Sequence, residues 1–365
     1  MIPRDKIGPE VVKEYNNSDG VKAFLVIDNT KFGPGKGGLR LAKGIAVEEI
    51  FRLARAMTYK NTMAGLPFGG AKSGIVIPDG VEKSNAIKWF AEQIKEFVPE
   101  KYVAGPDMST GEDEMKIIAE TIGTKRAATG KPVDMGGLPH ELGSTGFGVA
   151  KSVLTAVERM GLNIKDVTIA IEGFGNVGTF TAKYLSEKGA KITAVSDSKG
   201  TAYLKEGFDV EKLIRIKKET RAVKNYPGCE VYPTEKLFSL NTNVLIPGTR
   251  PDVINQNNYD KIKAKLIVEA ANIPITESVE EKLHNMGVLI VPDFVANAGG
   301  VISSWVEYEN SNKTGKTQQE VIESMFKVIE EKIVKNTKLV LDRAEKEKMS
   351  PRKAAKKIVE EKLLG

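Results

Sequence analysis

The feature that most constrains the fold of this 365-residue chain is a glycine-rich segment between a strand-like and a helix-like pattern. Gly173-Phe174-Gly175-Asn176-Val177-Gly178 follows the apolar run VTIAIE and begins the helix-like segment 176–189. In such a place the first glycine permits a tight turn, the second lets backbone approach a pyrophosphate, and the third lets helix and strand pack closely. The segment therefore predicts a dinucleotide site, with Gly173, Gly175, Asn176, Val177 and Gly178 around the phosphates at a helix N-terminus.

The pattern around this segment predicts a doubly wound α/β unit. Apolar runs of strand length alternate with helix-like segments, at 167–173, 192–197, 243–248, 266–272 and 288–294. Continuous apolar strands separated by helices are typical of a parallel sheet covered on both faces.

Asp197 ends the second of these runs, close to where an acidic side chain meets the adenosine ribose. An acidic residue there favours NAD over NADP, because a carboxylate repels a 2′-phosphate. The sequence SDSKG also suits an Asx-turn, so the choice between NAD and NADP stays open.

The first 135 residues form a different region. A strand is expected at 21–30, a helix at 46–64, a strand at 74–78 and a helix at 84–97. A glycine-rich joint, 135–148, separates the two regions. We therefore expect an α/β protein with a substrate and oligomerisation domain at 1–137 and a Rossmann-type dinucleotide-binding domain at 145–297. Helices in 298–365 are expected to pack back on the first domain.

Two lysines stand out in the first region. Lys60 falls at the edge of the apolar stripe of helix 46–64, and Lys72 is embedded in Gly-Gly-Ala-Lys-Ser-Gly, which is expected to form a turn. Glycine has no Cβ, so backbone at such a turn can approach a ligand closely. Taken alone, the segment is better explained as a solvated lysine in a flexible loop.

Composition excludes several classes of protein. The single cysteine, Cys229, allows no intrachain disulfide, and His140 and His284 lie far apart, so no zinc or other metal site is expected. No run approaches 18 apolar residues, which argues against membrane partners and favours the cytoplasm. The net charge is +6, but lysine and glutamate are interleaved, so no nucleic-acid partner is expected.

Six ordered motifs carry a resemblance to a known family. They contain Lys36 (GPGKGGLR), Lys60, Lys72 (GGAKSG), Asp107 (AGPDMSTG), Gly173 (GFGNVG) and Asn297 (VPDFVANAGGVISS). With them, the chain resembles the glutamate/leucine/phenylalanine/valine dehydrogenase family from about Lys31 to the RKAA segment. The resemblance implies a homo-oligomer, assembled through its first domain, that deaminates an L-amino acid oxidatively and transfers a hydride to NAD or NADP.

The resemblance also implies residue roles. Lys72 would activate water, Asp107 would relay a proton to or from the amino group, and Lys60 would hold the α-carboxylate. Thr145, Asn272 and Asn297 are retained on the cofactor side of the cleft.

The substrate side chain is expected to meet Lys36 and Ser304, which are polar in glutamate-type members and apolar in leucine-type members. A site that pairs a carboxylate rejects apolar side chains, so glutamate is favoured over branched-chain substrates. A leucine or valine dehydrogenase is the alternative within the family. Leu138, Glu141 and the segments 245–254 and 269–274 depart from the family pattern, which also leaves open a catalytically impaired nucleotide-binding regulator.

Overall fold

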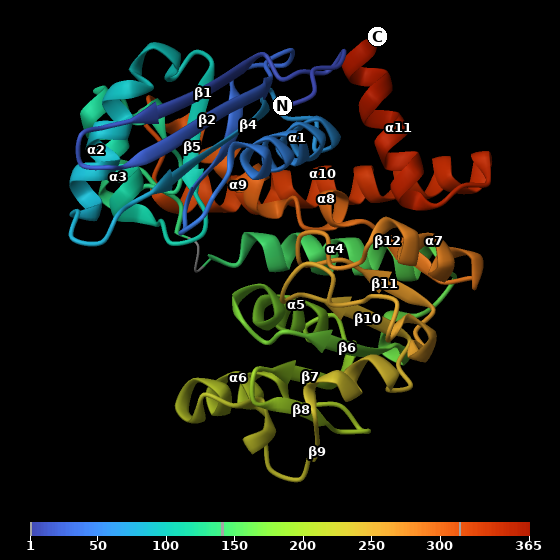
Figure 1. Cartoon of the computed structure of the whole chain (residues 1–365). Helices are drawn as coiled ribbons and strands as arrows, with labels where there is room; N and C mark the ends of the chain where they lie inside the picture. The colour runs from blue at the N-terminus through green and yellow to red at the C-terminus, as the bar shows by residue number, and fades with distance from the viewer. Residues whose placement is uncertain (1, 140–141, 314) are drawn as a thin grey trace. The chain divides into compact units, whose positions relative to one another are not determined.

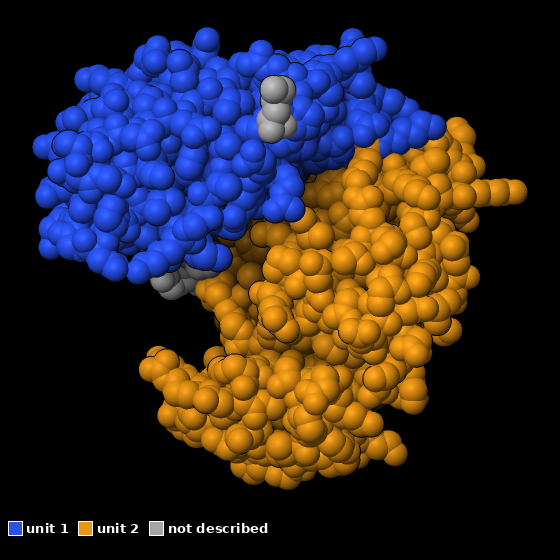
Figure 2. Space-filling view, in the orientation of Figure 1, with its two compact units in different colours: residues 1–142, 301–328, 357–365 blue, residues 143–300, 329–356 orange. Residues whose placement is uncertain are grey.

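The structure is a computed structural model that describes residues 2–139, 142–313 and 315–365. The chain divides into two compact units (Figures 1 and 2). Unit 1 comprises residues 1–142, 301–328 and 357–365, and unit 2 comprises residues 143–300 and 329–356. His140 and Glu141, in the joint, lie outside the described residues.

Unit 1 is built on a five-stranded sheet in the order β1-β2-β4-β3-β5. β3 runs parallel to β4 and β5, whereas β2 runs antiparallel to β1 and β4. The elements are β1 (Val11–Asn16), β2 (Lys22–Asn29), β3 (Gly35–Leu41), α1 (Val47–Met63), β4 (Gly69–Val76), α2 (Lys83–Gln93), β5 (Tyr102–Pro106) and α3 (Glu112–Ile122).

The two faces of this sheet bury different helices, because strand side chains alternate between faces. Phe24 and Val26 of β2 pack with Ile50 and Ala54 of α1. On the opposite face, the alternate residues of the strands pack with α2 and α3 in one cluster, which includes Leu25, Ile27, Leu39, Ala71, Ile75, Ile87, Phe90, Met115 and Ile118.

The prediction that Gly-Gly-Ala-Lys-Ser-Gly forms a turn is wrong, because residues 69–76 form the central strand β4. The reason lies in how closely α1 approaches this strand. A Cβ on Gly70 would lie 2.1 Å from the Thr58 Oγ1 atom, and one on Gly74 would lie 2.7 Å from the Ile50 Cδ1 atom. The glycines therefore let a helix pack directly on a strand, rather than forming a turn.

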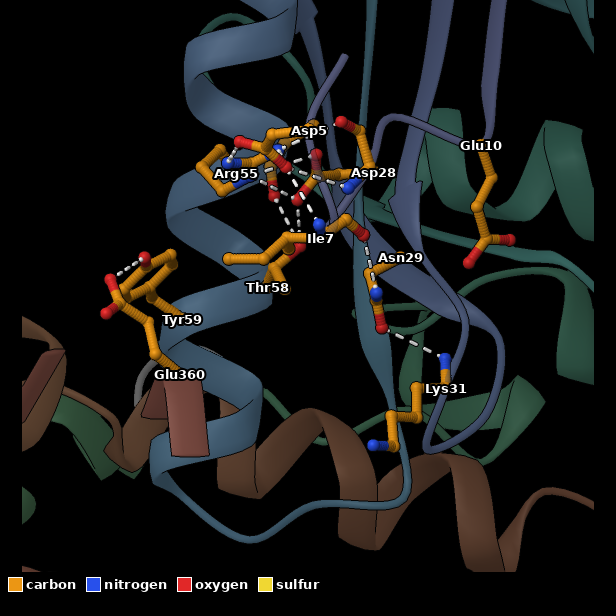
Figure 3. A network of polar contacts seen from close by, with 12 residues as sticks. Asp5, Ile7, Glu10, Asp28, Asn29, Lys31, Arg55, Thr58, Tyr59 and Glu360 are labelled. Carbon is orange, nitrogen blue, oxygen red and sulfur yellow. Dashed lines mark hydrogen bonds and ion pairs between the residues drawn. The ribbon is translucent and has the colours of Figure 1, made fainter. Parts of the chain in front are cut away.

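A buried polar network fixes α1 on the sheet (Figure 3). The Asp28 carboxylate on β2 is fully buried and accepts hydrogen bonds from Arg55 Nε at 2.8 Å and Thr58 Oγ1 at 2.5 Å. Arg55 also pairs with Asp5 at 2.7 Å. A buried carboxylate needs such partners, so the network ties the N-terminal segment and β2 to α1.

Unit 2 contains a seven-stranded sheet in the order β12-β11-β10-β6-β7-β8-β9. The strands from β12 to β7 in this order are parallel, which confirms the Rossmann-type prediction. The elements are α4 (Ser144–Arg159), β6 (Thr168–Glu172), α5 (Asn176–Ser186), β7 (Lys191–Asp197), β8 (Gly200–Tyr203), α6 (Val210–Thr220), β9 (Glu230–Tyr232), β10 (Val244–Pro247), β11 (Leu266–Val268), α7 (Glu277–Asn285), β12 (Leu289–Val291) and α8 (Asp293–Ala296). The short antiparallel strands β8 and β9 were not predicted.

The C-terminal helices are α9 (Gly299–Asn310), α10 (Gln318–Glu347) and α11 (Pro351–Leu364). The sequence predicts that residues 298–365 pack on the first domain; the structure groups residues 329–356 with unit 2 and the rest of 301–365 with unit 1. Within unit 1, Tyr59 donates a hydrogen bond to Glu360 at 2.7 Å (Figure 3). Lys31 Nζ donates to the Leu363 carbonyl at 3.0 Å.

Among the described residues, none of the helices has the length and apolar character required to cross a membrane. In the same part of the chain, no group of three or more His, Cys, Asp or Glu side chains is arranged to hold a metal ion.

Candidate active site

Lys36, Arg40 and Lys72 lie on one face of the unit 1 sheet. Lys36 on β3 is in register with Gly70 on β4 and Val103 on β5. Register partners on parallel strands share a face, and so do alternate residues along each strand. The structure therefore brings together side chains that are 32 to 36 positions apart in the sequence, on the face that also packs α1.

Two glycines on this face leave room for the ammonium groups. A Cβ on Gly105 would lie 2.4 Å from Lys36 Nζ. A Cβ on Gly38 would lie 3.2 Å from Lys72 Nζ and 2.8 Å from the Asp107 Cβ atom. Glycine at these two positions is therefore a condition for this arrangement of cations, because a larger residue would occupy the space of the lysine ammonium groups.

The core of the site is an ion pair between Lys72 and Asp107, which follows β5 directly. Lys72 Nζ lies 2.9 Å from Asp107 Oδ2, and Arg40 Nε donates to the same oxygen at 2.9 Å. Burial lowers the pKa of Lys72 although Asp107 opposes the shift. Burial acts to raise the pKa of Asp107, but the charge of Lys72 and the hydrogen bond from Arg40 outweigh it and leave that pKa below its usual value. The result is a lysine that releases its proton more readily than an exposed lysine, beside a carboxylate that stays charged.

Arg40 is a residue of this site that the sequence analysis did not identify. Its guanidinium bridges Asp107 and Glu49 of α1, the latter at 2.7 Å. A predicted strand at 35–41 would have revealed it, because Arg40 lies four positions after Lys36 in β3 and shares its face. Thr110 fixes the same loop, since its hydroxyl accepts from the Asp107 amide at 2.9 Å and donates to the Leu39 carbonyl at 2.7 Å.

Lys36 is a buried ammonium. Only 4% of its surface is exposed, and its Nζ donates to the Ala104 carbonyl at 3.0 Å. Burial lowers its pKa to about 7, the nearby charges of Lys72 and Lys131 act in the same direction, and Glu307 opposes them. A buried cation with a single side-chain hydrogen bond, to a neutral carbonyl, is suited to receive an anionic group.

Ser304 is half-buried on α9, one helical turn before Glu307. The negative charge of Glu307 raises the pKa of Lys36 and so opposes the effect of burial. Glu307 itself pairs with the fully buried Lys131 at 2.6 Å and accepts from the Gly130 amide at 2.9 Å. Lys131 and Glu307 are 176 residues apart and carried no local sequence signal.

Lys60 lies in the last turn of α1 and is half-buried. Lys60 lies near the C-terminus of α1, because the helix ends at Met63, one residue before the predicted end. Its role toward the α-carboxylate stays a prediction.

The glycine-rich turn of unit 2 has the geometry that a dinucleotide requires. Gly173 adopts a left-handed φ of +92°, which favours glycine. A Cβ on Gly178 would lie 2.0 Å from the Gly173 carbonyl oxygen, so α5 and β6 pack too closely for any side chain there. Gly175 and Asn176 are exposed, and no described atom lies within 4 Å of a Cβ built on Gly175. Val177 is half-buried behind them. The N-terminus of α5 is thus open for a phosphate.

Asp197 ends β7 with its carboxylate already engaged. The Lys199 amide donates to Oδ1 at 2.7 Å, which is the Asx-turn bond. Lys217 Nζ and the Val223 amide donate to Oδ2 at 2.5 Å and 2.8 Å. Burial acts to raise the pKa of Asp197, but these hydrogen bonds, led by that from Lys217, hold it below its usual value.

Three further predicted cofactor residues lie around the N-terminus of α4 and the ends of β11 and α8. Asn297 is buried, and its Nδ2 donates to Asn272 Oδ1 at 3.2 Å, so these two side chains are in direct contact. Thr145 lies in the first turn of α4, where a Cβ on Gly300 would come within 2.9 Å of its Oγ1 atom.

A Rossmann-type unit with an open glycine turn, together with a separate unit in which a buried lysine pairs with a half-buried aspartate, is typical of nicotinamide-dependent dehydrogenases. The family model described as Glutamate/Leucine/Phenylalanine/Valine dehydrogenase matches residues 136–364, and that of the Glu/Leu/Phe/Val dehydrogenase dimerisation domain matches residues 9–124. The chain belongs to this family and is an NAD(P)-dependent amino-acid dehydrogenase.

Relatives of known name agree with this assignment. The chain is 38% identical over 340 residues to a glutamate dehydrogenase of Aeropyrum pernix, which covers 89% of this chain and 81% of the relative. It is 38% identical over 323 residues to an NADP-specific glutamate dehydrogenase of Saccharolobus shibatae, covering 84% and 76%. The fold is similar to that of the hetero-hexameric glutamate dehydrogenase of Thermus thermophilus in its Leu-bound form, with a TM-score of 0.83, 27% identity and coverage of 97% and 88%.

Proposed function

We propose that this protein catalyses the reversible oxidative deamination of L-glutamate to 2-oxoglutarate and ammonia, with hydride transfer to NAD or NADP. The observation that carries the proposal is the buried Lys36 ammonium on the same sheet face as the paired Lys72 and Asp107. The names of the relatives support it, since those at 38% identity are glutamate dehydrogenases.

The chemistry follows from the charges of the site. When bound, the nicotinamide accepts the hydride that leaves the substrate Cα, and the amino acid becomes an iminium. Lys72, whose pKa burial lowers, takes a proton from the water that adds to this iminium carbon. Asp107, charged at the start, takes a proton from the substrate ammonium before the hydride leaves and returns it to the nitrogen of the carbinolamine. Ammonia then leaves as the carbonyl forms, and the hydroxyl proton of the carbinolamine passes to solvent. Arg40 and Lys72 hold the Asp107 carboxylate in place, and Lys60 is assigned to the substrate α-carboxylate.

Lys36 and Ser304 are assigned to the distal carboxylate of glutamate. A substrate carboxylate beside Lys36 stabilises the charged ammonium, which burial otherwise disfavours. A leucine or valine side chain would instead leave this ammonium without an anionic partner in a buried site. The site chemistry therefore favours glutamate over branched-chain substrates.

The residues of unit 2 are assigned to the dinucleotide. Gly173 to Gly178 would hold the pyrophosphate, with Thr145, Asn272 and Asn297 on the nicotinamide side. Asp197 is proposed at the adenosine ribose, and Lys217 beside it partly offsets its charge. Both NAD and NADP are therefore retained as candidate cofactors.

Assembly and compartment are also proposals. A homo-oligomer formed through unit 1 is supported by the match of residues 9–124 to a dimerisation domain. The proposed partners are small molecules only, with neither nucleic acid nor membrane. The cytoplasm is the proposed compartment, because the one cysteine of the chain allows no intrachain disulfide.

The test is a spectrophotometric assay of the purified protein with NADH or NADPH, ammonium and 2-oxoglutarate. Ammonium-dependent oxidation of either nucleotide, with glutamate as the product, is expected. Tight nucleotide binding without turnover on 2-oxoglutarate or 4-methyl-2-oxopentanoate would contradict the proposal and favour the nucleotide-binding regulator.

A further inference from the structure

One buried guanidinium in unit 2 faces three carboxylates. Arg352, in the first turn of α11, is 7% exposed and contacts Glu269 Oε2 at 2.5 Å, Asp293 Oδ1 at 3.0 Å and the Glu280 carboxylate. Burial raises the pKa of Glu269 well above its usual value, and that of Glu280 as well, despite the opposing charge of Arg352. Removing the guanidinium would leave buried acids without a cation, a strongly unfavourable arrangement.

Two of these carboxylates also accept hydrogen bonds from backbone amides. Glu269 Oε2 accepts from the Asp293 amide at 2.9 Å, and Asp293 Oδ2 accepts from the Ile273 amide at 2.9 Å. Glu269 follows β11, and Asp293 begins α8. Arg352 therefore braces the loop after β11 and the start of α8 against each other, whereas Glu280 lies on α7, outside these two segments.

The braced loop is strained. Ile273 has φ of +49°, a left-handed conformation that is unfavourable for a β-branched residue. Such a conformation persists only where the surroundings enforce it, and here the hydrogen bond from its amide to Asp293 does so. The loop carries Asn272, and Asn297 follows α8, so the same brace fixes both side chains, which contact each other at 3.2 Å.

We propose that Arg352 is a positioning residue for the nucleotide site, acting through Glu269 and Asp293 on Asn272 and Asn297. The inference rests on the proposed function only in assigning these two asparagines to the nucleotide. Arg352 touches neither reacting group. Its loss lets the strained loop relax, which moves Asn272 away from Asn297 and weakens nucleotide binding before it alters amino-acid binding.

Three variants test the inference: Arg352→Met, Arg352→Lys and the control Arg159→Met. Arg159 also pairs with two carboxylates of unit 2, Asp342 and Glu345, but it is partly exposed and far in sequence from the loop. Small displacements of active-site groups have large functional effects, so Arg352→Met is expected to raise the Kd for NADH by about tenfold to a hundredfold. The KM for the oxo acid should change by less than about threefold. The Kd of Arg352→Lys for NADH should lie between those of wild type and Arg352→Met, because lysine keeps the positive charge but not the planar geometry of the guanidinium. The Arg159→Met control should bind NADH like wild type.

A double variant separates positioning from folding. Arg352→Met/Glu280→Gln carries one buried acid fewer than Arg352→Met and should recover melting temperature without recovering the Kd for NADH. Recovery of both, or an unchanged Kd in folded Arg352→Met, would overturn the inference. Because NADH binding is read by fluorescence without any oxo acid, weakened binding in Arg352→Met supports the positioning role even if wild type fails to use 2-oxoglutarate.

Discussion

Replacing Lys36 by methionine is expected to stabilise the folded protein while removing its recognition of glutamate. Burial lowers the pKa of Lys36 from 10.5 to about 7. At about 1.4 kcal/mol for each pKa unit, this difference (10.5 − 7 = 3.5) disfavours the charged native form by about 5 kcal/mol. The Ala104 carbonyl would lose the hydrogen bond from Lys36, although it keeps the one from the Thr129 amide, and this loss opposes the gain by about 1–3 kcal/mol. The net expectation near pH 7 is a gain of about 2–4 kcal/mol in the free energy of unfolding.

The sign of the pH dependence is fixed by the direction of this shift. Because the native pKa lies below the unfolded one, the unfavourable contribution of Lys36 is fully present below about pH 7. It disappears as the pH rises toward 10.5, where the lysine is neutral in both states. The advantage of Lys36→Met should therefore be largest at pH 6.5 and small at pH 9.5.

Urea unfolding of wild type, Lys36→Met and the control Lys88→Met at pH 6.5 and 9.5 measures this directly. Lys88 is exposed on α2, so its replacement should change stability by no more than about 0.5 kcal/mol at either pH. A Lys36→Met protein no more stable than wild type at pH 6.5, or an advantage that persists at pH 9.5, would refute the reasoning.

Three further predictions concern the other parts of the two units. Asp107→Ser should abolish turnover while NADH binding, measured by fluorescence, stays at the wild-type level; near-normal turnover would exclude its assigned proton relay. Gly178→Ala should lower the melting temperature, because its Cβ would lie 2.0 Å from a carbonyl oxygen. Gly175→Ala should fold normally and bind NADH more weakly. A Gly175→Ala protein that loses stability, beside a Gly178→Ala protein that is stable but binds NADH weakly, would contradict the assignment of the glycines. Asp197 has a pKa below its usual 3.8, so its stabilising contribution is present above pH 3.8 and is lost as the pH falls through the native pKa. The stability difference between wild type and Asp197→Asn should thus shrink in acid, and a constant difference would show that the charge contributes nothing.

The sequence predicts what local spacing determines. The segment Gly173 to Gly178 has the predicted geometry, because its three glycines act within one strand-turn-helix unit. The helix predicted at 46–64 is also found, within one residue at each end. These features depend on periodicity and on helix stop signals, both of which are read within a few residues.

Features that depend on tertiary contact were missed or wrong. The segment 69–76 is a central strand because α1 packs on its glycines, and sequence alone does not reveal that approach. Glu307 and Lys131 pair across 176 residues, and Arg352 reaches carboxylates 59 to 83 residues away. Arg40 shares the face of β3 that carries Lys36, which a predicted strand at 35–41 would have revealed.

The measurement that tests the central claim most directly is the ratio of kcat/KM for 2-oxoglutarate to that for 4-methyl-2-oxopentanoate, with ammonium and saturating NADH or NADPH. A site built around the buried Lys36 ammonium should favour 2-oxoglutarate by about 10³-fold or more, because the branched side chain leaves that cation unpaired. A ratio near or below one in the wild-type enzyme would contradict the assignment of Lys36 and Ser304 and identify a branched-chain amino-acid dehydrogenase instead.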